Sequence, residues 1–250
     1  MSVFILSDLH IRDAEDPVYR SLLCLMRSRT QSGDQLVLAG DIFDLFVGNK
    51  AVFRNRYSEF FECLAEMGRR GVLVYYVEGN HDFLLQKVMR GIPGLTVHPS
   101  EVSLEAEGRH FLVAHGDLAD SSDLGYRVLR CFFRSPMMKF LVRVLPGKWL
   151  EWIGSQSSGY SRGKNPVLFS ELPLERQDAL RKIYRNFAAE RLAQGYDFVV
   201  LGHCHDLDEM MFQIGGRPGQ YMNVGFPRVH GSILKWESGD DRIQRESLSG

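Results

Sequence analysis

Five short apolar runs, each about as long as a β-strand, end in a polar segment rich in Asp, Asn and His. The runs cover residues 3–6, 35–39, 71–77, 109–114 and 197–201. Continuous apolar runs of this length are typical of strands that are buried on both faces of a sheet. Ligand sites in α/β proteins lie just past the carboxyl ends of such strands, so we expect the five polar segments to share one cleft.

The polar segments offer carboxylate, amide and imidazole groups that can bind metal ions. Asp8 and His10 can face one ion if their loop stays extended, although a plain polar loop is an equal alternative. His203 and His205 also project to one side of an extended segment, which turns Cys204 away as a structural residue. The candidate ligands in chain order are Asp8, His10, Asp41, Asn80, His115, His203 and His205.

Asp41 is the central candidate, because it follows the apolar run 35–39 directly. Its two carboxylate oxygens could bind two cations at once, and a site with metals about 3.5–4 Å apart clamps both oxygens of a phosphoryl transfer. Asp44 is interpreted as a partner that holds a ligand or its loop, with a plain helix cap as the alternative. His81 could approach a phosphate rather than the ions.

The segments between these motifs alternate helical and strand patterns. Apolar residues recur at helical spacing, which predicts amphipathic helices. The predicted helices cover 17–30, 53–70 and 175–194, and the further strands cover 95–97, 101–104, 220–225 and 232–236. The whole chain, 1–250, is therefore expected to be a single α/β domain that carries one insertion.

The insertion, 118–173, breaks the strand and helix pattern with short, very apolar helical stretches. Between residues 124 and 164 it carries eight basic residues and one acidic residue, although the net charge of the chain is only -1. Such a segment can be an ordinary helical insertion with solvated charges. It can also be a lid that is apolar on one face and cationic on another, which suits an amphiphile that carries phosphate.

The cysteines and the first residues indicate the compartment. Four cysteines stand far apart and form no Cys-x-x-Cys pair, which favours a reducing cytosol. The opening residues 1–6 lack a basic leader, and no stretch approaches the ~20 apolar residues of a membrane span. We therefore expect a cytoplasmic protein whose membrane contact is peripheral.

The five polar segments together resemble the motifs of the calcineurin-like metallophosphoesterases. The motifs are Asp8-x-His10, Gly40-Asp41-x-x-Asp44, Gly79-Asn80-His81-Asp82, His115-Gly116 and Gly202-His203-x-His205. The resemblance implies an α/β fold, a four-layer α/β/β/α sandwich with a helical lid. It also implies a dinuclear site that hydrolyses phosphoric esters.

The resemblance further implies how the ligands are divided between two ions. One metal takes Asp8, His10, Asp41 and His205, and the other takes Asp41, Asn80, His115 and His203. His81 and Asp41 are the implied catalytic residues, and His81 stabilises the transition state or protonates the leaving oxygen. A donor set without sulfur suits two divalent ions such as manganese, with iron or zinc as alternatives.

A narrower resemblance is to the UDP-2,3-diacylglucosamine pyrophosphatases of lipid A synthesis. It rests on the segment 79–85, on His115-Gly116-Asp117 and on Asp123-x-Gly125-Tyr126. It implies a nucleotide-sugar-lipid substrate that is cleaved to UMP and 2,3-diacylglucosamine 1-phosphate at the cytoplasmic face of the inner membrane. The implied substrate-binding residues are Asn80, His81, Asp123, Tyr126, Arg162, Lys164 and His203.

Two other functions stay open. Those pyrophosphatases typically carry Arg where His81 stands, which leaves room for a phosphodiesterase with another substrate, such as a nucleotide or nucleic acid. Nucleic acid is disfavoured because the basic residues are confined to the insertion and form no extended track. A non-catalytic scaffold is disfavoured by the complete set of ligand residues.

Overall fold

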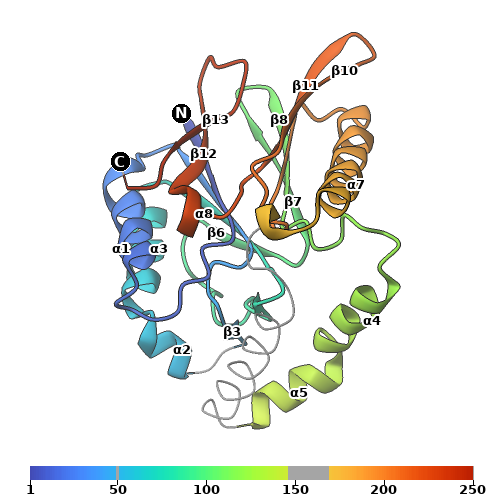
Figure 1. Ribbon diagram of the computed structural model, residues 1–250. Coiled ribbons are helices and arrows are strands. Elements are labelled where there is room, and N and C mark those ends of the chain that lie inside the picture. The colour runs from blue at the N-terminus through green and yellow to red at the C-terminus, as the bar shows by residue number, and fades with distance from the viewer. Residues whose placement is uncertain (49–50, 146–168, 250) are drawn as a thin grey trace.

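The computed structural model describes residues 1–48, 51–145 and 169–249, and it has two large sheets with helices on their outer faces (Figure 1). The first sheet has the strand order β13-β12-β1-β2-β4-β6. Its strands are β1 Ser2–Leu6, β2 Gln35–Ala39, β4 Leu73–Val77, β6 Leu95–His98, β12 Ser232–Glu237 and β13 Gln244–Ser247.

The second sheet has the strand order β10-β11-β9-β8-β7. Its strands are β7 Glu101–Ala106, β8 Arg109–Ala114, β9 Phe198–Leu201, β10 Glu209–Ile214 and β11 Arg217–Asn223. A separate short pair joins β3 Phe46–Val47 to β5 Asp82–Phe83. This pair lies beside the polar loops and is one of the places where the insertion packs.

The alternation of side chains along β1 shows how the layers are made. Phe4 and Leu6 belong to the core that also contains residues of α1 (Pro17–Cys24) and α3 (Ser58–Arg69). Val3 and Ile5 point the other way and pack with residues of the second sheet. The first sheet is therefore buried on both faces, as its continuous apolar strands predict.

The outer face of the second sheet is covered by α7, Leu174–Ala193 (Figure 1). Tyr184, Ala188 and Leu192 of this helix pack on Leu112 and Val199 of the sheet. The order of layers is thus helices, sheet, sheet, helix. The predicted α/β/β/α sandwich is confirmed.

The strands that precede the polar segments run in parallel within each sheet. β1, β2 and β4 are parallel neighbours in the first sheet, and β8 and β9 are parallel neighbours in the second. Their carboxyl ends release the loops 7–11, 40–45, 78–81, 115–123 and 202–208. Hydrogen bonds join these loops directly, for example from the Asp8 N–H to the Gly40 carbonyl at 3.1 Å.

The insertion begins with α4, Leu124–Phe133, and α5, Pro136–Val144, which extend away from the two sheets (Figure 1). Val142 is the buried residue of α5 and packs on Val47 and Phe83 of the small strand pair. Residues 146–168 of the predicted lid, including the candidates Arg162 and Lys164, lie outside the described residues.

Some predicted elements differ in the structure. The helix predicted at 53–70 is two helices, α2 (Ala51–Arg56) and α3, because Tyr57 leaves the helical conformation and donates its hydroxyl to the Arg12 carbonyl at 3.1 Å. The helix predicted at 17–30 is α-helical only from Pro17 to Cys24, and a π-helical turn, Leu25–Arg29, follows it directly. The edge strands β10 and β13 were not predicted. None of the helices in the described ranges has the length and apolar character to cross a bilayer.

Candidate metal centre

The structure brings all seven predicted ligands together at the carboxyl ends of the strands. Three groups form here among the described residues, each with its ligating atoms mutually within 4.8 Å: Asp8 with His10 and His205, Asp41 with His115 and His203, and His10 with Asp44 and His81. The first two groups each combine ligands from both sheets, because His115 and the His203–His205 segment follow strands of the second sheet whereas Asp8 and Asp41 follow strands of the first. The site thus spans the seam between the sheets.

The first group surrounds one oxygen of Asp8. Its Oδ1 lies 3.3 Å from His205 Nε2 and 4.0 Å from His10 Nε2, and the two ring nitrogens are 3.3 Å apart. The other oxygen, Oδ2, accepts hydrogen bonds from the Ser7 hydroxyl at 2.5 Å and the His203 N–H at 2.9 Å. Asp8 therefore holds the loop with one oxygen and faces the group with the other.

The second group surrounds His115. Its Nε2 lies 3.0 Å from Asn80 Oδ1, 3.2 Å from His203 Nδ1 and 3.5 Å from Asp41 Oδ2. The opposite ring nitrogen, Nδ1, lies 3.1 Å from the Ala39 carbonyl, to which it donates, so Nε2 is the nitrogen left to face a cation.

Asp41 belongs to the second group and also faces His10 of the first with the same oxygen. Its Oδ2 lies 3.5 Å from His115 Nε2 and 3.8 Å from His10 Nε2. The other oxygen, Oδ1, accepts the N–H of His81 at 2.9 Å. That Asp41 bridges two ions stays a prediction; in the structure Oδ2 is the oxygen that faces both histidines, and Oδ1 accepts a backbone N–H.

The backbone of the ligand loops is strained. Among the described residues, seven non-glycine positions have positive φ, and five of them are candidate ligands: Asp8 (56°), His10 (45°), Asp41 (53°), His203 (69°) and His205 (60°). The left-handed conformation costs roughly 1–3 kcal/mol at such residues and is kept only where the surroundings over-determine it. The prediction of extended ligand segments is wrong, and left-handed turns are what aim the paired ligands.

Glycines make room for the groups at three points. A Cβ added to Gly202 would lie 2.4 Å from Asp8 Oδ2, and one added to Gly79 would lie 2.2 Å from Asp41 Oδ1. A Cβ on Gly40 would lie 2.6 Å from His115 Nδ1. Each of these glycines lies beside a ligand in the sequence, so the loops can close on one another only without a side chain there.

The donor atoms fit divalent cations. Asp8 Oδ1 is buried and makes no hydrogen bond, which leaves a carboxylate oxygen that a cation would satisfy. Burial lowers the pKa of His10 to about 4, and burial with the charge of His115 lowers that of His203 to about 4, so both rings are neutral and able to ligate. Burial would raise the pKa of Asp41, but His115 and His81 hold it well below its ordinary value.

His115 carries the proton that a cation would replace. Burial disfavours its charged form, but the Asp41 carboxylate outweighs burial and raises the pKa of His115 to about 10. In the metal-free protein this proton partly balances the negative charge of Asp8 and Asp41. A cation at the second group would therefore displace a proton, as is usual for metal binding by histidine.

His81 and Asp44 form the third group together with His10, which also belongs to the first. The ring of His81 packs edge-on to His10 with centroids 5.0 Å apart, and its Nδ1 donates to the Asp44 carbonyl at 2.8 Å. Asp44 Oδ1 lies 3.9 Å from His10 Nδ1. Asp44 thus supports its neighbours, and the next described helix, α2, begins at Ala51.

Asp82 is a site residue that the sequence interpretation missed. It is fully buried, and its Oδ1 accepts the N–H groups of Asp41 and Gly79, each at 2.9 Å. Its Oδ2 accepts the Ile42 N–H at 2.7 Å and the Tyr76 hydroxyl at 2.6 Å. Asp82 therefore fastens the Asp41 loop to the loop that carries Asn80. Its place within Gly79-Asn80-His81-Asp82 was the only signal in the sequence.

We expect Asp82→Asn to lower the free energy of unfolding by about 3 kcal/mol, because one acceptor becomes a donor that faces the Ile42 N–H in a buried site. Urea unfolding in the presence of EDTA measures this without a contribution from bound metal. Asp241→Asn, at a side chain that is 90% exposed, is the matched control and should change little. Equal stability of the Asp82 and Asp241 variants would contradict this role.

The predicted substrate residues Asp123 and Tyr126 have internal partners. Asp123 caps α4 by accepting the Tyr126 N–H at 2.8 Å. The Tyr126 hydroxyl donates to Asp117 Oδ2 at 2.5 Å, and Arg130 Nε donates to the same oxygen at 2.7 Å. Tyr126 and Arg130 thus join α4 to the loop that carries His115, whereas Asp123 caps the first turn of α4.

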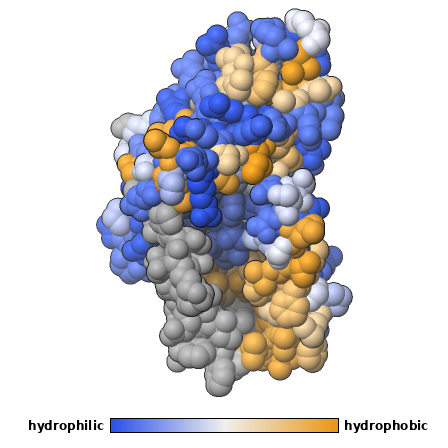
Figure 2. Space-filling view, turned by 45° about the vertical axis from the view of Figure 1, so that its right-hand side comes forward, coloured by the Kyte–Doolittle hydropathy of each residue, from blue (hydrophilic) through white to orange (hydrophobic). Residues whose placement is uncertain are grey.

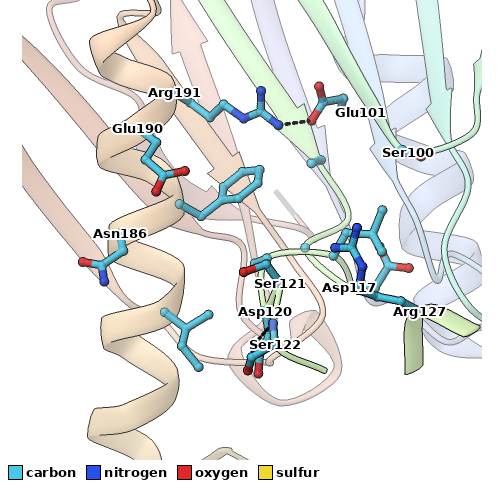
Figure 3. A pocket seen from close by; sticks show the side chains of 16 residues that line it. Ser100, Glu101, Asp117, Asp120, Ser121, Ser122, Arg127, Asn186, Glu190 and Arg191 are labelled. Atoms are coloured by element: carbon cyan, nitrogen blue, oxygen red, sulfur yellow. Dashed lines mark hydrogen bonds and ion pairs between the residues drawn. The ribbon is translucent and has the colours of Figure 1, made fainter. Parts of the chain in front are cut away.

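A cavity of about 580 Å³ lies on the other side of this loop, between it and α7 (Figure 3). Asp117, Asp120, Arg127 and Asn186 are among its lining residues. It contains none of the seven candidate ligands. The cavity is therefore separate from the metal groups, although both share the loop 116–122.

Comparison with known proteins places the motifs in a wider context. A family model described as calcineurin-like phosphoesterase matches residues 1–207. A UDP-2,3-diacylglucosamine hydrolase from Pseudomonas entomophila is 26% identical over 227 residues, which cover 89% of this chain and 90% of that protein. The enzyme of the same name from Aeromonas salmonicida is 24% identical over 249 residues, which cover 99% and 94%. A solved structure described as a novel archaeal phosphodiesterase covers 99% of both chains at 13% identity with a TM-score of 0.45.

Proposed function

This chain belongs to the calcineurin-like phosphoesterase family and is a metal-dependent phosphoester hydrolase, and from this premise we propose that it cleaves the diphosphate of UDP-2,3-diacylglucosamine. The products would be UMP and 2,3-diacylglucosamine 1-phosphate. The observation that supports the chemistry most strongly is Asp41 Oδ2, which lies between two separate groups of ligands. The relatives named for this substrate, together with the surface of the insertion, support the choice of substrate.

We assign one cation to Asp8, His10, Asp41 and His205 and the other to Asp41, Asn80, His115 and His203. The ions, proposed to be manganese with iron or zinc as alternatives, would lower the pKa of water toward about 7 and offset charge on the phosphate. The protein holds these positions with the neutral imidazoles of His10 and His203 and with carboxylates whose other oxygens accept backbone N–H groups. Such preorganisation means that little has to move during the reaction.

His81 is the proposed proton donor to the leaving oxygen. Its Nδ1 donates to the Asp44 carbonyl, which leaves Nε2 as the nitrogen that can act on substrate. Burial lowers the pKa of His81, but Asp41 and the Asp44 carbonyl outweigh burial and raise it above its ordinary value. The raised pKa favours the protonated ring, which can give up a proton as charge develops on the leaving group.

The surface of α4 and α5 is suited to acyl chains. Figure 2 shows an apolar surface over this part of the molecule. The exposed side chains include Val128 at 70%, Phe140 at 63% and Val144 at 63%. An exposed apolar surface of this kind, beside a site for phosphate, fits a lipid that carries a diphosphate and also peripheral contact with a membrane. We therefore propose that the predicted lid, 118–173, binds the acyl chains at the cytoplasmic face of the inner membrane.

The proposed substrate can be tested by incubating the protein with manganese and UDP-2,3-diacylglucosamine and measuring UMP by chromatography. Release of UMP is the expected result, and UDP-N-acetylglucosamine, which lacks the acyl chains, should release far less. Bis-p-nitrophenyl phosphate is the second substrate. Hydrolysis of this diester without release of UMP would favour a phosphodiesterase with another substrate, for which His81 in place of Arg leaves room. No hydrolysis of either substrate would favour the non-catalytic scaffold.

A further inference from the structure

Two arginines from outside the five polar segments bind the backbone of the ligand loops. Arg134 directly follows α4, and its Nη2 donates to the Gly79 carbonyl at 2.8 Å. Its guanidinium also lies 5.5 Å from the centre of the Phe83 ring, and its Nε is 3.7 Å from Glu78 Oε2. Arg134 thus reaches from the insertion to the peptide that immediately precedes Asn80.

Arg228 makes the corresponding contacts on the other side of the site. It belongs to α8, Pro227–His230, which lies beyond the region matched by the family model. Its Nε donates to the Leu9 carbonyl and its Nη2 to the His10 carbonyl, each at 3.0 Å. The buried Asp16 carboxylate pairs with the same guanidinium. Arg228 therefore fixes both carbonyls that flank the left-handed residue His10.

These contacts act where the ligand loops are least stable on their own. His10 has a φ of 45°, which a non-glycine residue keeps only if its surroundings hold it. Asn80 follows Gly79, a residue without a side chain to restrict it, so the direction of the Asn80 side chain depends on how the Gly79–Asn80 peptide is held. A guanidinium loses little freedom per hydrogen bond, which suits it to fixing a carbonyl.

The docking of α4 explains why Arg134 comes from the insertion. Tyr126, Arg130 and Arg134 are four residues apart and form one stripe on the helix, which contacts the ligand loops. On the opposite side, Leu124 and Val128 are 69% and 70% exposed. The helix therefore turns its polar stripe toward the protein and its apolar face outward, so polar contacts with the ligand loops hold it in place.

We propose that Arg134 and Arg228 are positioning residues, each for one ion. Arg134 supports the ion held by Asn80, His115 and His203, and Arg228 supports the ion held by Asp8, His10 and His205. The inference rests on the proposed metal centre. Removal of groups that orient metal ligands typically weakens metal affinity by about 10–100-fold. Each arginine variant should therefore lower the affinity for one of the two ions by that factor.

The test is a manganese titration in two backgrounds that each retain one ion. The His205→Ala background retains the manganese ion near Asn80. Adding Arg134→Ala should lower the affinity for this ion about 10–100-fold, whereas adding Arg228→Ala should leave that affinity unchanged. The Asn80→Ala background retains the manganese ion near His10. Here Arg228→Ala should lower the affinity for the ion, and Arg134→Ala should leave it unchanged. Electron paramagnetic resonance of free manganese measures each affinity without any substrate.

Three further variants separate positioning from loss of the fold. Arg134→Lys and Arg228→Lys keep one donor each and should recover part of the affinity. Arg127 lies on the same helix but lines the cavity of Figure 3, so Arg127→Ala should leave the affinity for both ions unchanged. A positioning role also predicts a lower kcat for Arg134→Ala on bis-p-nitrophenyl phosphate with little change in KM, since so small a diester does not need the insertion for binding.

The outcomes distinguish this inference from the proposed function. One outcome is that the unmodified protein binds two manganese ions and each arginine variant lowers the affinity for both ions equally, or for neither. The positioning roles are then wrong and the proposed function stands. If the unmodified protein binds fewer than two, the proposed metal centre fails and the inference fails with it.

Discussion

Asp41→Asn is expected to lower kcat for manganese-dependent hydrolysis of bis-p-nitrophenyl phosphate by at least about 10³-fold, a loss of roughly 4 kcal/mol. Asn keeps an oxygen that can accept the His81 N–H, as Asp41 Oδ1 does at 2.9 Å, so the loop should retain its fold. The amide NH₂ then replaces Oδ2, the atom that faces both His10 and His115. A neutral donor at this point repels both cations.

Manganese content, measured on the purified protein, provides a readout that does not depend on turnover. Two ions per chain are expected before the substitution and one or none after it. Asp241→Asn removes an exposed carboxylate paired with Arg109 and should keep both the activity and the manganese content. If Asp41→Asn retained two ions and more than a tenth of the activity, the shared oxygen would have no bridging role.

The positions of the ligands were predictable because they depend on a local pattern. A buried strand such as 35–39 is apolar throughout, and the residue that follows it must leave the sheet at the edge where parallel strands end. The same reasoning predicts Asp8, Asn80 and His115 at this edge, and in the structure each of them lies just past the end of its own strand. Membership of the site could thus be predicted for each loop without knowledge of the other loops.

The residues that bind the backbone of the ligand loops were not predictable, because their contacts join segments that are distant in the sequence. Arg134 and Gly79 are 55 residues apart, and Arg228 and Leu9 are 219 residues apart. Nothing in either local sequence marks these arginines, which look like ordinary basic residues of short helices. Asp82 is similar, because its carboxylate binds N–H groups of a loop 40 residues away.

The orientation of α4 shows a second limit. Its sequence predicts an amphipathic helix, and the usual expectation is that the apolar face packs on the protein. Here Asp117 offers a carboxylate to Tyr126 and Arg130, so the polar face packs inward and Val128 is left exposed. Periodicity identifies the two faces, but the chemistry of the surface they meet decides which one is buried.

His81→Ala should lower kcat by about 10²–10⁴-fold on substrates with a poor leaving group, because the proton on the leaving oxygen would then have to come from water. The loss should be much smaller for bis-p-nitrophenyl phosphate, since p-nitrophenolate leaves readily without a proton. Because His81 is in neither of the two assigned ligand sets, the variant should keep two manganese ions. The fall in kcat with a poor leaving group, divided by the fall in kcat with bis-p-nitrophenyl phosphate, therefore measures how far His81 acts as a general acid.

His81→Arg separates proton donation from charge alone, because a guanidinium is cationic but does not give up a proton near neutral pH. If His81 is the acid, the Arg variant should resemble the Ala variant on the poor leaving group. Near-normal activity of His81→Arg on both substrates would instead assign His81 to stabilising charge. The pKa of His81 lies above its ordinary value, so an acid role also predicts that kcat falls as the pH rises through that pKa and that this fall is absent in the Arg variant.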